Sequence, residues 1–316
     1  MPTLEQQQTA RKTYLGGSEI AAAMGVSKWT TPLALWAEKT GKLPDDPLRN
    51  SEAMEIGLEL QEYVARKFER RTGKKLRADQ QELVHPAYPY LRGHADYIVL
   101  NEDATFDSKT TSAYQLKAWE GETIPLDYVL QQNWYMGLKK ALNLKGWQSA
   151  YLGVLIGGQR FLWKQFAFDP ALFDEQVASA VKFWTAFVEQ DVMPVAMAND
   201  QDLLVQLFPA EQGPLRLLNV SGDQAHDVDT LLTRRASSLR QIKTEELIVE
   251  DCEAKLKQAI GETGGLVTAR HRVTWQLQTS KRLDYARLRL DGIYNQYCRD
   301  TSTRALRVTN TEVANG

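Results

Sequence analysis

The sequence contains little cysteine, no long apolar run and almost no excess of either charge. Its only two cysteines, Cys252 and Cys298, lie late in the chain without the spacing of metal ligands. This argues against a disulfide scaffold and a zinc site, and favours a reducing, cytosolic setting. Lys and Arg total 38 and Asp and Glu total 40, so no global basic field draws the chain to nucleic acid. Any nucleic-acid partner must therefore contact local basic patches.

Membrane and disordered classes are also disfavoured. No segment approaches the roughly 18 consecutive apolar residues that cross a bilayer. The opening MPTLEQQQTARK lacks the apolar core of a signal peptide, so we expect a soluble protein without a membrane partner, located in the cytoplasm of the cell that makes it. A hydrophobic fraction of 43% with 25% charged residues is that of an ordinary globular protein.

The first 195 residues predict an α/β unit. Ser18 is expected to cap a helix that begins at Glu19, and an apolar stripe of Ile56, Leu60, Val64 and Phe68 indicates a long helix over 51–72. Residues 90–100 and 104–110 predict a β-hairpin. The remaining expected elements are a helix over 32–41, a helix over 126–142, strands over 147–156 and 161–168, and a helix over 169–189.

The rest of the chain has a different character. Residues 196–222 are predicted to be a linker with at most one short helix, and residues 223–316 a helical appendage with a short β-ribbon over 266–278 and a last helix over 285–297. In its first helix, apolar residues recur mostly every seven and three positions, as in a helix that pairs with another helix. These residues are Leu232, Leu239, Ile242, Val249, Leu256 and Ile260.

The candidate chemistry lies in the predicted hairpin. The two-residue period of a strand points Asp107 and Lys109 to the same face. Asp96, on the preceding strand, is expected nearly opposite Asp107. Two carboxylates on one face repel each other, and a hard divalent cation, Mg²⁺ or Mn²⁺, is the usual remedy. With a lysine to stabilise charge on a phosphoryl group, this geometry indicates a metal-dependent phosphodiester hydrolase.

Taken alone, the Asp-x-Lys triplet is more often a salt-bridged edge strand than a catalytic site. The order of the surrounding elements makes the pattern more specific. An acid-rich helix precedes the hairpin, and a polar helix with Tyr128, Gln131 and Tyr135 in a Tyr-x-x-Gln-x-x-x-Tyr pattern follows it.

Together with the motifs GGSEIAAAMGVSKW, RRTG and GHADY, this order resembles the PD-(D/E)xK nuclease superfamily. In particular, it is similar to the YqaJ-type viral recombinases, which include lambda-exonuclease-like alkaline exonucleases, over roughly residues 11–195. The resemblance implies a restriction-endonuclease-like core, a small mixed sheet flanked by helices. It also implies a Mg²⁺-dependent 5′→3′ exonuclease of phage-type recombination that acts on double-stranded DNA ends in a bacterial host cell. Its partners would be two further copies in a homotrimeric ring and a single-strand annealing recombinase.

The resemblance assigns roles to particular residues. Asp96 and Asp107 match the two acids that hold the metal, Lys109 matches the lysine, and Tyr128 and Gln131 match the polar helix that borders the site.

One position departs from the family pattern. Where these nucleases usually carry a helical glutamate, this chain has Gln61, which can accept a hydrogen bond but brings no charge. Either Gln61 serves in that position, or the nearby Glu62 or Glu59 replaces it.

A second predicted site holds the terminal 5′ phosphate. Ser18 lies at the start of a predicted helix, whose N–H groups favour an anion, and Arg11 precedes it by seven residues. In lambda-exonuclease-like proteins, a serine and an upstream arginine at matching places hold this phosphate.

Two other readings stay open at this point. The missing charge at Gln61 is compatible with a non-cleaving module that binds DNA ends and recruits a partner. The same metal site would also serve a structure-specific or nicking endonuclease.

Overall fold

The chain divides into two compact units, Met1–Pro209 and Ala210–Gly316. The computed structural model describes residues 11–43, 51–121, 123–216, 223–299 and 306–308. Within these residues, no helix is both long and apolar enough to cross a membrane.

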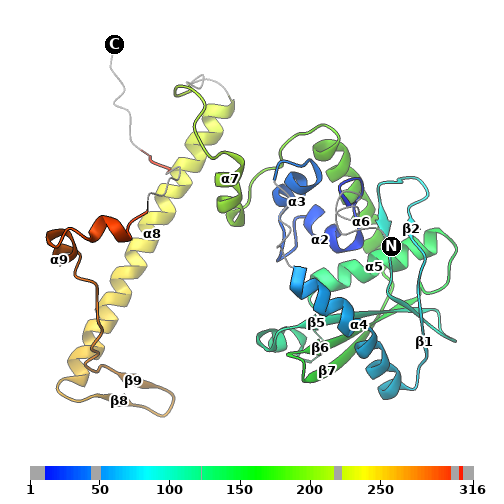
Figure 1. Ribbon diagram of the computed structural model, residues 1–316, viewed down its shortest axis with the longest axis horizontal. Coiled ribbons are helices and arrows are strands. Elements are labelled where there is room, and N and C mark those ends of the chain that lie inside the picture. Colours follow the sequence, from blue (N-terminus) through cyan, green and yellow to red (C-terminus); the bar gives the residue numbers. More distant parts are fainter. Residues whose placement is uncertain (1–10, 44–50, 122, 217–222, 300–305, 309–316) are drawn as a thin grey trace. The chain divides into compact units, whose positions relative to one another are not determined.

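The N-terminal unit is built on a five-stranded mixed sheet. The strands lie in the order β1-β4-β5-β6-β7, where β5 and β6 run parallel and the other neighbours are antiparallel. Their bounds are β1 Leu76–Ala78, β4 Tyr97–Val99, β5 Ala104–Thr111, β6 Ser149–Ile156 and β7 Arg160–Ala167. The principal helices are α2 Ile20–Ala23, α3 Pro32–Lys39, α4 Ser51–Thr72, α5 Leu126–Ala141, α6 Pro170–Phe183 and α7 Gln201–Leu207. Helices flanking a small mixed sheet confirm the expected fold class (Figure 1).

The hairpin differs from its prediction in one respect. The expected continuous strand over 90–100 is two strands in two sheets: β3 (Arg92–Gly93) pairs with β2 (Leu83–Val84), and β4 pairs with β5. Between them the chain changes partner, and the carbonyl of Asp96 accepts a hydrogen bond from the amide of Asp79 at 2.9 Å. Asp96 therefore lies at the end of the β4 ladder, where its carboxylate is not confined to one face of the sheet.

One face of the sheet is covered by α4. Val64 and Phe68 are fully buried and pack against Phe106 of β5 and Tyr151 of β6. The predicted stripe is wrong at its first position, because Ile56 is 46% exposed. Gly57 lies instead beside Thr110 of β5, 3.8 Å from its hydroxyl when a Cβ is placed on the glycine.

The opposite face is covered by the crossover between β5 and β6. It comprises η2 (Ala113–Trp119), a 3-10 helix, and α5, and it buries Trp119 against Leu152 and Val154, with Tyr128 partly buried beside them. Since side chains alternate along β5, Phe106 faces α4, whereas Asp107 and Lys109 face the crossover.

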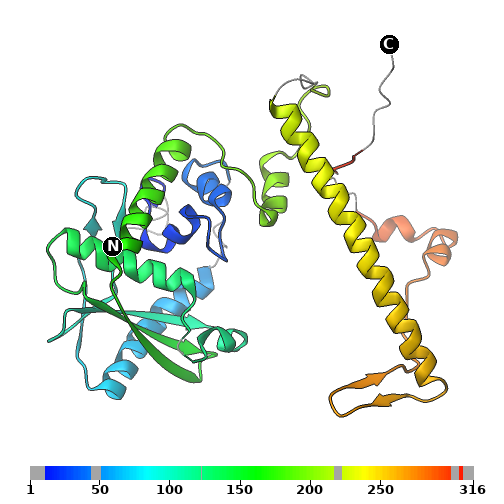
Figure 2. The same cartoon turned by 180° about the vertical axis from the view of Figure 1, so that it is seen from behind.

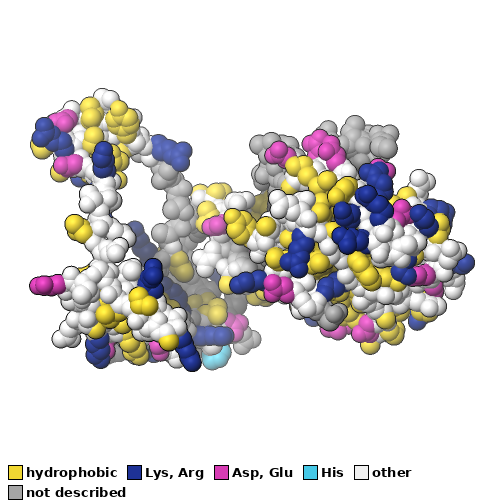
Figure 3. Space-filling view, turned by 90° about the horizontal axis from the view of Figure 1, so that it is seen from below, with side chains coloured by type: hydrophobic (Ala, Val, Ile, Leu, Met, Phe, Trp, Pro, Cys, Tyr) yellow, Lys and Arg dark blue, Asp and Glu magenta, His cyan; other side chains and the backbone are white. Residues whose placement is uncertain are grey.

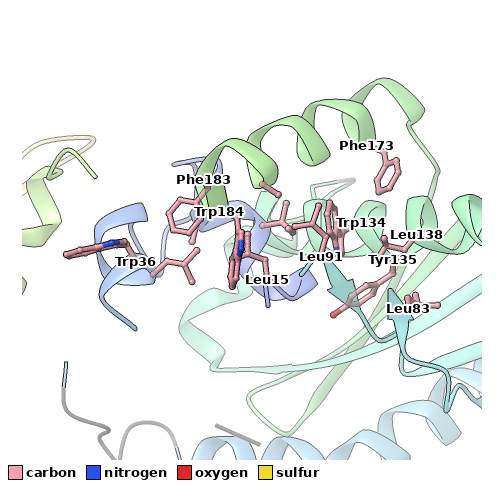
Figure 4. Close-up of a cluster of buried hydrophobic side chains, with 14 of the residues drawn as sticks. Leu15, Trp36, Leu83, Leu91, Trp134, Tyr135, Leu138, Phe173, Phe183 and Trp184 are labelled. Carbon is pink, nitrogen blue, oxygen red and sulfur yellow. The ribbon is translucent and has the colours of Figure 1, made fainter. Parts of the chain in front are cut away.

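A second, helical core lies on the side of α5 away from the sheet, where α2, α3 and α6 gather (Figures 1 and 2). Trp134 and Leu138 of α5 contribute buried side chains, and Phe183 and Trp184 at the end of α6 meet them in the same cluster (Figure 4). The chain leaves α6 through a π-helical turn, Trp184–Val188.

The start of the domain corrects the expected helix cap. The first turn is η1 (Gly17–Glu19), a 3-10 helix, and Gly16 is the capping residue. Ser18 lies inside the turn and does not cap it. The side chain that closes the turn is that of Glu19, whose carboxylate accepts a hydrogen bond from the Gly16 amide at 2.8 Å.

Part of the segment predicted as linker packs on the N-terminal unit. η4 (Ala198–Asp200), a further 3-10 helix, leads into α7, and Leu203, Leu204 and Leu207 contact the helical core. Asp200 is buried and accepts a hydrogen bond from the hydroxyl of Thr31, the cap of α3, at 2.5 Å.

The C-terminal unit is dominated by one helix, α8 (Asp223–Ile260). A short antiparallel ribbon follows, with β8 at Gly265–Val267 and β9 at Arg272–Thr274. The predicted last helix is interrupted. Its first part, α9 (Tyr285–Leu290), ends shortly before Gly292, which adopts a φ of 71°. A short 3-10 helix, η5 (Tyr294–Tyr297), follows.

Candidate active site

The two predicted acids lie side by side. The β4–β5 register pairs Tyr97 with Phe106, and continuing it by one residue places Asp96 opposite Asp107. The carboxylate of Asp96 accepts a hydrogen bond from the Ser108 amide at 3.0 Å. Burial and the neighbouring Asp107 carboxylate raise the pKa of Asp96 to about 7.

Lys109 completes the group. Its ammonium lies 2.6 Å from Oδ2 of Asp107, whose side chain is only 2% exposed. Oδ2 of Asp107 is thus a buried oxygen beside the Lys109 ammonium. Burial opposes the charge on Lys109, but the Asp107 carboxylate outweighs it and raises the lysine's pKa above the usual value. The lysine is therefore held as a cation beside two acids.

The polar helix borders this group as predicted. The ammonium of Lys109 lies 5.5 Å from the centre of the Tyr128 ring, which stacks on Trp119. One turn later, the Gln131 amide donates to the hydroxyl of Tyr135 at 2.8 Å. Burial raises the pKa of Tyr135, so this phenol stays neutral.

Two glycines of the recognised motifs make room for Tyr135. A Cβ on Gly17 would lie 2.3 Å from the Tyr135 ring, and one on Gly93 would lie 2.9 Å from it. Both distances are shorter than van der Waals contact allows. The GGSE and GHADY motifs thus share one structural reason, since each places a glycine against a tyrosine of α5.

A cavity of about 580 Å³ opens beside Lys109. Lys109, Tyr128 and Gln131 form one part of its wall, and the N-terminal segment contributes Ser18 and Trp29. The hydroxyl of Ser27 donates to Asp127 at 2.6 Å and joins the two parts of the wall. Sequence reasoning missed this link, because nothing in the sequence pairs residues a hundred positions apart.

Arg11 does not line this cavity. Its side chain is exposed, and its carbonyl accepts a hydrogen bond from the buried Lys39 ammonium, which also forms an ion pair with Glu19 at 2.7 Å. Since Glu19 already binds the Gly16 amide, that N–H is not available to an anion. Of the two predicted phosphate-binding residues, the structure places only Ser18 at the cavity.

The candidate helical acids lie away from Asp107. α4 covers the face of the sheet opposite to the one that carries Asp107 and Lys109. Glu59 is exposed, and Glu62 is 74% exposed and forms an ion pair with Arg66 at 2.6 Å. Gln61 is half-buried, one helical turn from Gly57, which lies beside Thr110. Within the described residues, no cluster of three or more His, Cys, Asp or Glu side chains could hold a metal.

Two carboxylates nevertheless fit a hard divalent cation. Asp96 and Asp107 carry charges that repel each other, and Oδ2 of Asp107 is buried. A Mg²⁺ ion satisfies such oxygens and completes its shell with water, so it does not need a third protein carboxylate. The donor set therefore suits Mg²⁺ or Mn²⁺.

Comparisons with known proteins find similar sequences and structures. The chain is similar to the protein YqaJ of Bacillus subtilis, whose function is uncharacterised, with 29% identity over 298 residues, 93% of this chain and 90% of that protein.

Solved structures with a similar fold include an alkaline exonuclease from Laribacter hongkongensis, LHK-Exo, at 15% identity and a TM-score of 0.46, over 59% of this chain and 93% of that one. A phage-related exonuclease from Haemophilus somnus 129PT is similar at 15% identity and a TM-score of 0.39, over 57% of this chain and 96% of that one.

The model of one protein family matches the first part of the chain. Residues 7–139 match the YqaJ-like viral recombinase domain. This span includes both acids, the lysine and the first part of the polar helix. This part of the chain is thus similar to the YqaJ-like viral recombinase domain.

Proposed function

We propose that this protein is a metal-dependent nuclease that degrades one strand of linear duplex DNA from its 5′ end. The 3′ single strands left behind would serve an annealing protein in phage-type recombination, and the active assembly would be a homotrimeric ring. The observation that carries the proposal is the position of Lys109: it forms an ion pair with Asp107 and also lines the cavity that Ser18 reaches.

Asp96 and Asp107 would hold the metal. Their mutual repulsion and the buried Oδ2 of Asp107 support this assignment. The bound Mg²⁺, or Mn²⁺ in its place, would supply Lewis acidity and an activated water for phosphodiester hydrolysis.

The other residues act on the phosphate and the strand. Lys109 is a partly buried cation that lines the cavity, so it can stabilise negative charge that grows on a phosphoryl group. Tyr128 and Gln131 offer a phenol and an amide along the same wall, where they would position the strand to be cut. The Lys and Arg side chains on the face of the N-terminal unit seen in Figure 3 are interspersed with apolar and acidic ones. DNA contacts would accordingly be local.

A substitution at Gln61 tests which residue of α4 takes the place of the family's helical glutamate. If Gln61 occupies the place of the family's glutamate, Gln61→Glu adds a charged oxygen near the metal, and we expect at least unchanged activity at a lower Mg²⁺ requirement. Glu62→Gln and Glu59→Gln are matched controls that remove a solvent-exposed charge, and each should leave the Mg²⁺ dependence unaltered. If Glu62→Gln or Glu59→Gln alone raised the Mg²⁺ requirement, that glutamate would be the helical acid instead.

The terminal phosphate is the proposed determinant of direction. Each cut exposes a new 5′ phosphate, and a pocket that binds it would draw the strand forward by one nucleotide. Ser18 lies on the cavity wall, and Arg11 would have to approach it when DNA binds. Duplexes with a 5′ phosphate should be degraded faster than 5′-hydroxyl duplexes. Ser18→Ala and Arg11→Ala should each reduce that preference without changing the Mg²⁺ requirement.

The polarity experiment uses duplexes labelled at each end in turn. Early release of label from the 5′ ends, with the 3′-labelled strand still long, supports the proposal. Equal rates on 5′-phosphate and 5′-hydroxyl ends would contradict the pocket, and early release from the 3′ ends would contradict the direction. Cutting of covalently closed circles would favour the endonuclease alternative, and binding without cutting would favour the recruitment module.

A further inference from the structure

The apolar stripe of α8, the long helix of the C-terminal unit, is exposed. From residue 226 to 259 every position of α8 is exposed except Ser237, which is partly buried. Leu239 is 48% exposed, Ile242 53% and Val249 56%. A helix this long, with a narrow apolar stripe and charged flanks, gains its stability by packing that stripe on another helix.

The stripe follows a heptad repeat. Taking Leu232 as position a, the a and d positions form a single seam along the helix. Its members from Val228 to Leu256 are Val228, Leu232, Arg235, Leu239, Ile242, Glu246, Val249, Glu253 and Leu256. Ile260 continues the seam but is already buried within its own unit, and the exposed Leu247 and Ile248 lie outside it.

The three charged seam residues decide the orientation of a self-pairing. In a parallel bundle of identical helices, each layer contains the same residue from every copy. Arg235 would face Arg235, and Glu246 and Glu253 would each face themselves. Like charges opposed in a seam are strongly unfavourable, so both a parallel pair and a parallel three-helix bundle are disfavoured.

An antiparallel arrangement removes this conflict. With the helices aligned over their full exposed length, Arg235 lies opposite Glu253 of the second copy, an attractive pair that occurs twice by symmetry. We infer that α8 is a pairing helix, which packs antiparallel against α8 of a second copy of this chain, so that the α8 helices would join two of the proposed rings.

The apolar layers agree with this register. Leu232 meets Leu256 of the second copy, and Leu239 meets Val249, again twice each. Beside the seam, Asp229 lies next to Lys257 of the second copy. A register shifted by one heptad, so that Leu232 meets Val249, would bring Asp229 beside Glu250.

Two symmetry-related layers of the pair are mixed. Ile242 lies opposite Glu246 of the second copy, and Lys243 follows Ile242 directly, within reach of that carboxylate. Each layer thus contains an apolar side chain and a neutralised acid, which limits the cost of the glutamate in the seam.

A charge exchange in the full-length chain tests the pairing. Arg235→Glu opposes two acids, and Glu253→Arg opposes two arginines, so each substitution should weaken self-association by at least about tenfold. At a fixed protein concentration near the dissociation constant, the average sedimenting mass should fall toward that of the unpaired species. The double variant Arg235→Glu with Glu253→Arg restores opposite charges and should restore the mass.

Rescue by the double variant distinguishes a loss of pairing from damage to the helix itself. Asp251→Asn is the matched control on the same helix, because Asp251 contacts only Lys255 of its own turn among its described interactions. Unchanged mass in both single variants would overturn the inference. A double variant as dissociated as the single ones would also overturn it.

Chemical cross-linking tests the orientation. Cys252 is exposed and flanks the seam, and Ser238 of the second copy lies beside it only in the antiparallel register. In a Cys298→Ser background, Ser238→Cys should therefore give a cross-linked dimer with a short bis-maleimide reagent. Within one chain these positions are 14 residues, or about 21 Å, apart, so the product must join two chains.

The matched control introduces a second cysteine that would lie close to Cys252 of the partner only if the two helices were parallel. Lys257→Cys in the same background would lie beside Cys252 of a parallel partner, and we expect it to give no more dimer than the background protein. A dimer from Lys257→Cys but not from Ser238→Cys would overturn the antiparallel assignment. The absence of dimer in both would overturn the pairing itself.

Discussion

The two units of the chain place their large apolar residues in opposite environments. In the N-terminal unit, Phe68, Trp134 and Leu138 are fully buried, and one hydrophobic core lies on each side of α5. On α8 of the C-terminal unit, Leu239 and Val249 are about half exposed. Burial of such side chains is the main stabilising term in folding. The first unit therefore has its own stabilising core, whereas α8 requires a second surface.

The chemistry follows the same division. Asp96, Asp107 and Lys109 are held on the rigid sheet, and Tyr128 and Gln131 lie on a helix packed against it. A preorganised site needs such a scaffold, because its donors must stay in place during reaction. We therefore propose that cleavage takes place in the N-terminal unit and that α8 serves assembly.

The largest expected effect concerns the charge at the proposed centre. Asp107→Asn removes a proposed metal ligand while keeping the size of the side chain, and we expect nuclease activity to fall by about a thousandfold or more. Asp251→Asn on α8 makes the same chemical change at an exposed acid and should leave the rate per chain unchanged. Initial rates of nucleotide release measure both. Comparable losses in the two variants would break the assignment of cleavage to one unit.

Core stability gives the next largest difference. Leu138→Ala removes a fully buried side chain of α5 and should lower the free energy of unfolding of the N-terminal unit by about 2–5 kcal/mol. Leu239→Ala on α8 should change that same free energy by less than about 0.5 kcal/mol. Urea unfolding followed by tryptophan fluorescence reports the comparison. A large effect of Leu239→Ala on this transition would show that the N-terminal unit depends on α8.

Removing the second unit sharpens the same point. A chain ending at Pro209 keeps both cores and all the proposed site residues, so it should fold and retain most of the cleavage rate on short duplexes. Self-association and processivity on long duplexes should decrease. Gel filtration and digestion of duplexes of two lengths measure these effects. Loss of Mg²⁺-dependent cleavage in the shortened chain would contradict the division.

The smallest expected effect is a pH dependence in the helical core. Burial lowers the pKa of His85, which packs near Tyr88 and Phe173. The unfolded chain therefore binds a proton before the folded one does, and stability is lost as the pH falls below about 6.5 toward the folded pKa. Thermal unfolding of the wild-type protein and His85→Gln between pH 7.5 and 5 measures this. A loss of the same size in the variant would exclude His85 as its source.

Local rules predicted much of the fold and the centre of the site. The two-residue period of strands and the turn at residues 101–103 were enough to place Asp96 opposite Asp107, because a short hairpin fixes its own register. The helices α4 and α5 were predicted within a residue or two from their apolar spacing and terminal residues.

The features that sequence reasoning missed depend on distant contacts. The Ser18 cap was wrong because the carboxylate of Glu19 binds the Gly16 amide, a choice that the nearby Lys39 ion pair stabilises. Nothing local reveals that Gly17 and Gly93 both lie against Tyr135. The interruption of the predicted strand after Gly93 likewise depends on β2, a partner strand that sequence reasoning did not predict.

The most direct test of the account is divalent-cation-dependent release of nucleotides from linear duplex DNA by the full-length chain. We expect steady release with Mg²⁺ or Mn²⁺, none in the presence of a chelator, and none with Mg²⁺ when Lys109→Met replaces the proposed charge-stabilising group. Release that continues in the chelator, or a Lys109→Met protein as active as the wild type, would contradict the claim that these acids and this lysine form a metal-dependent nuclease centre.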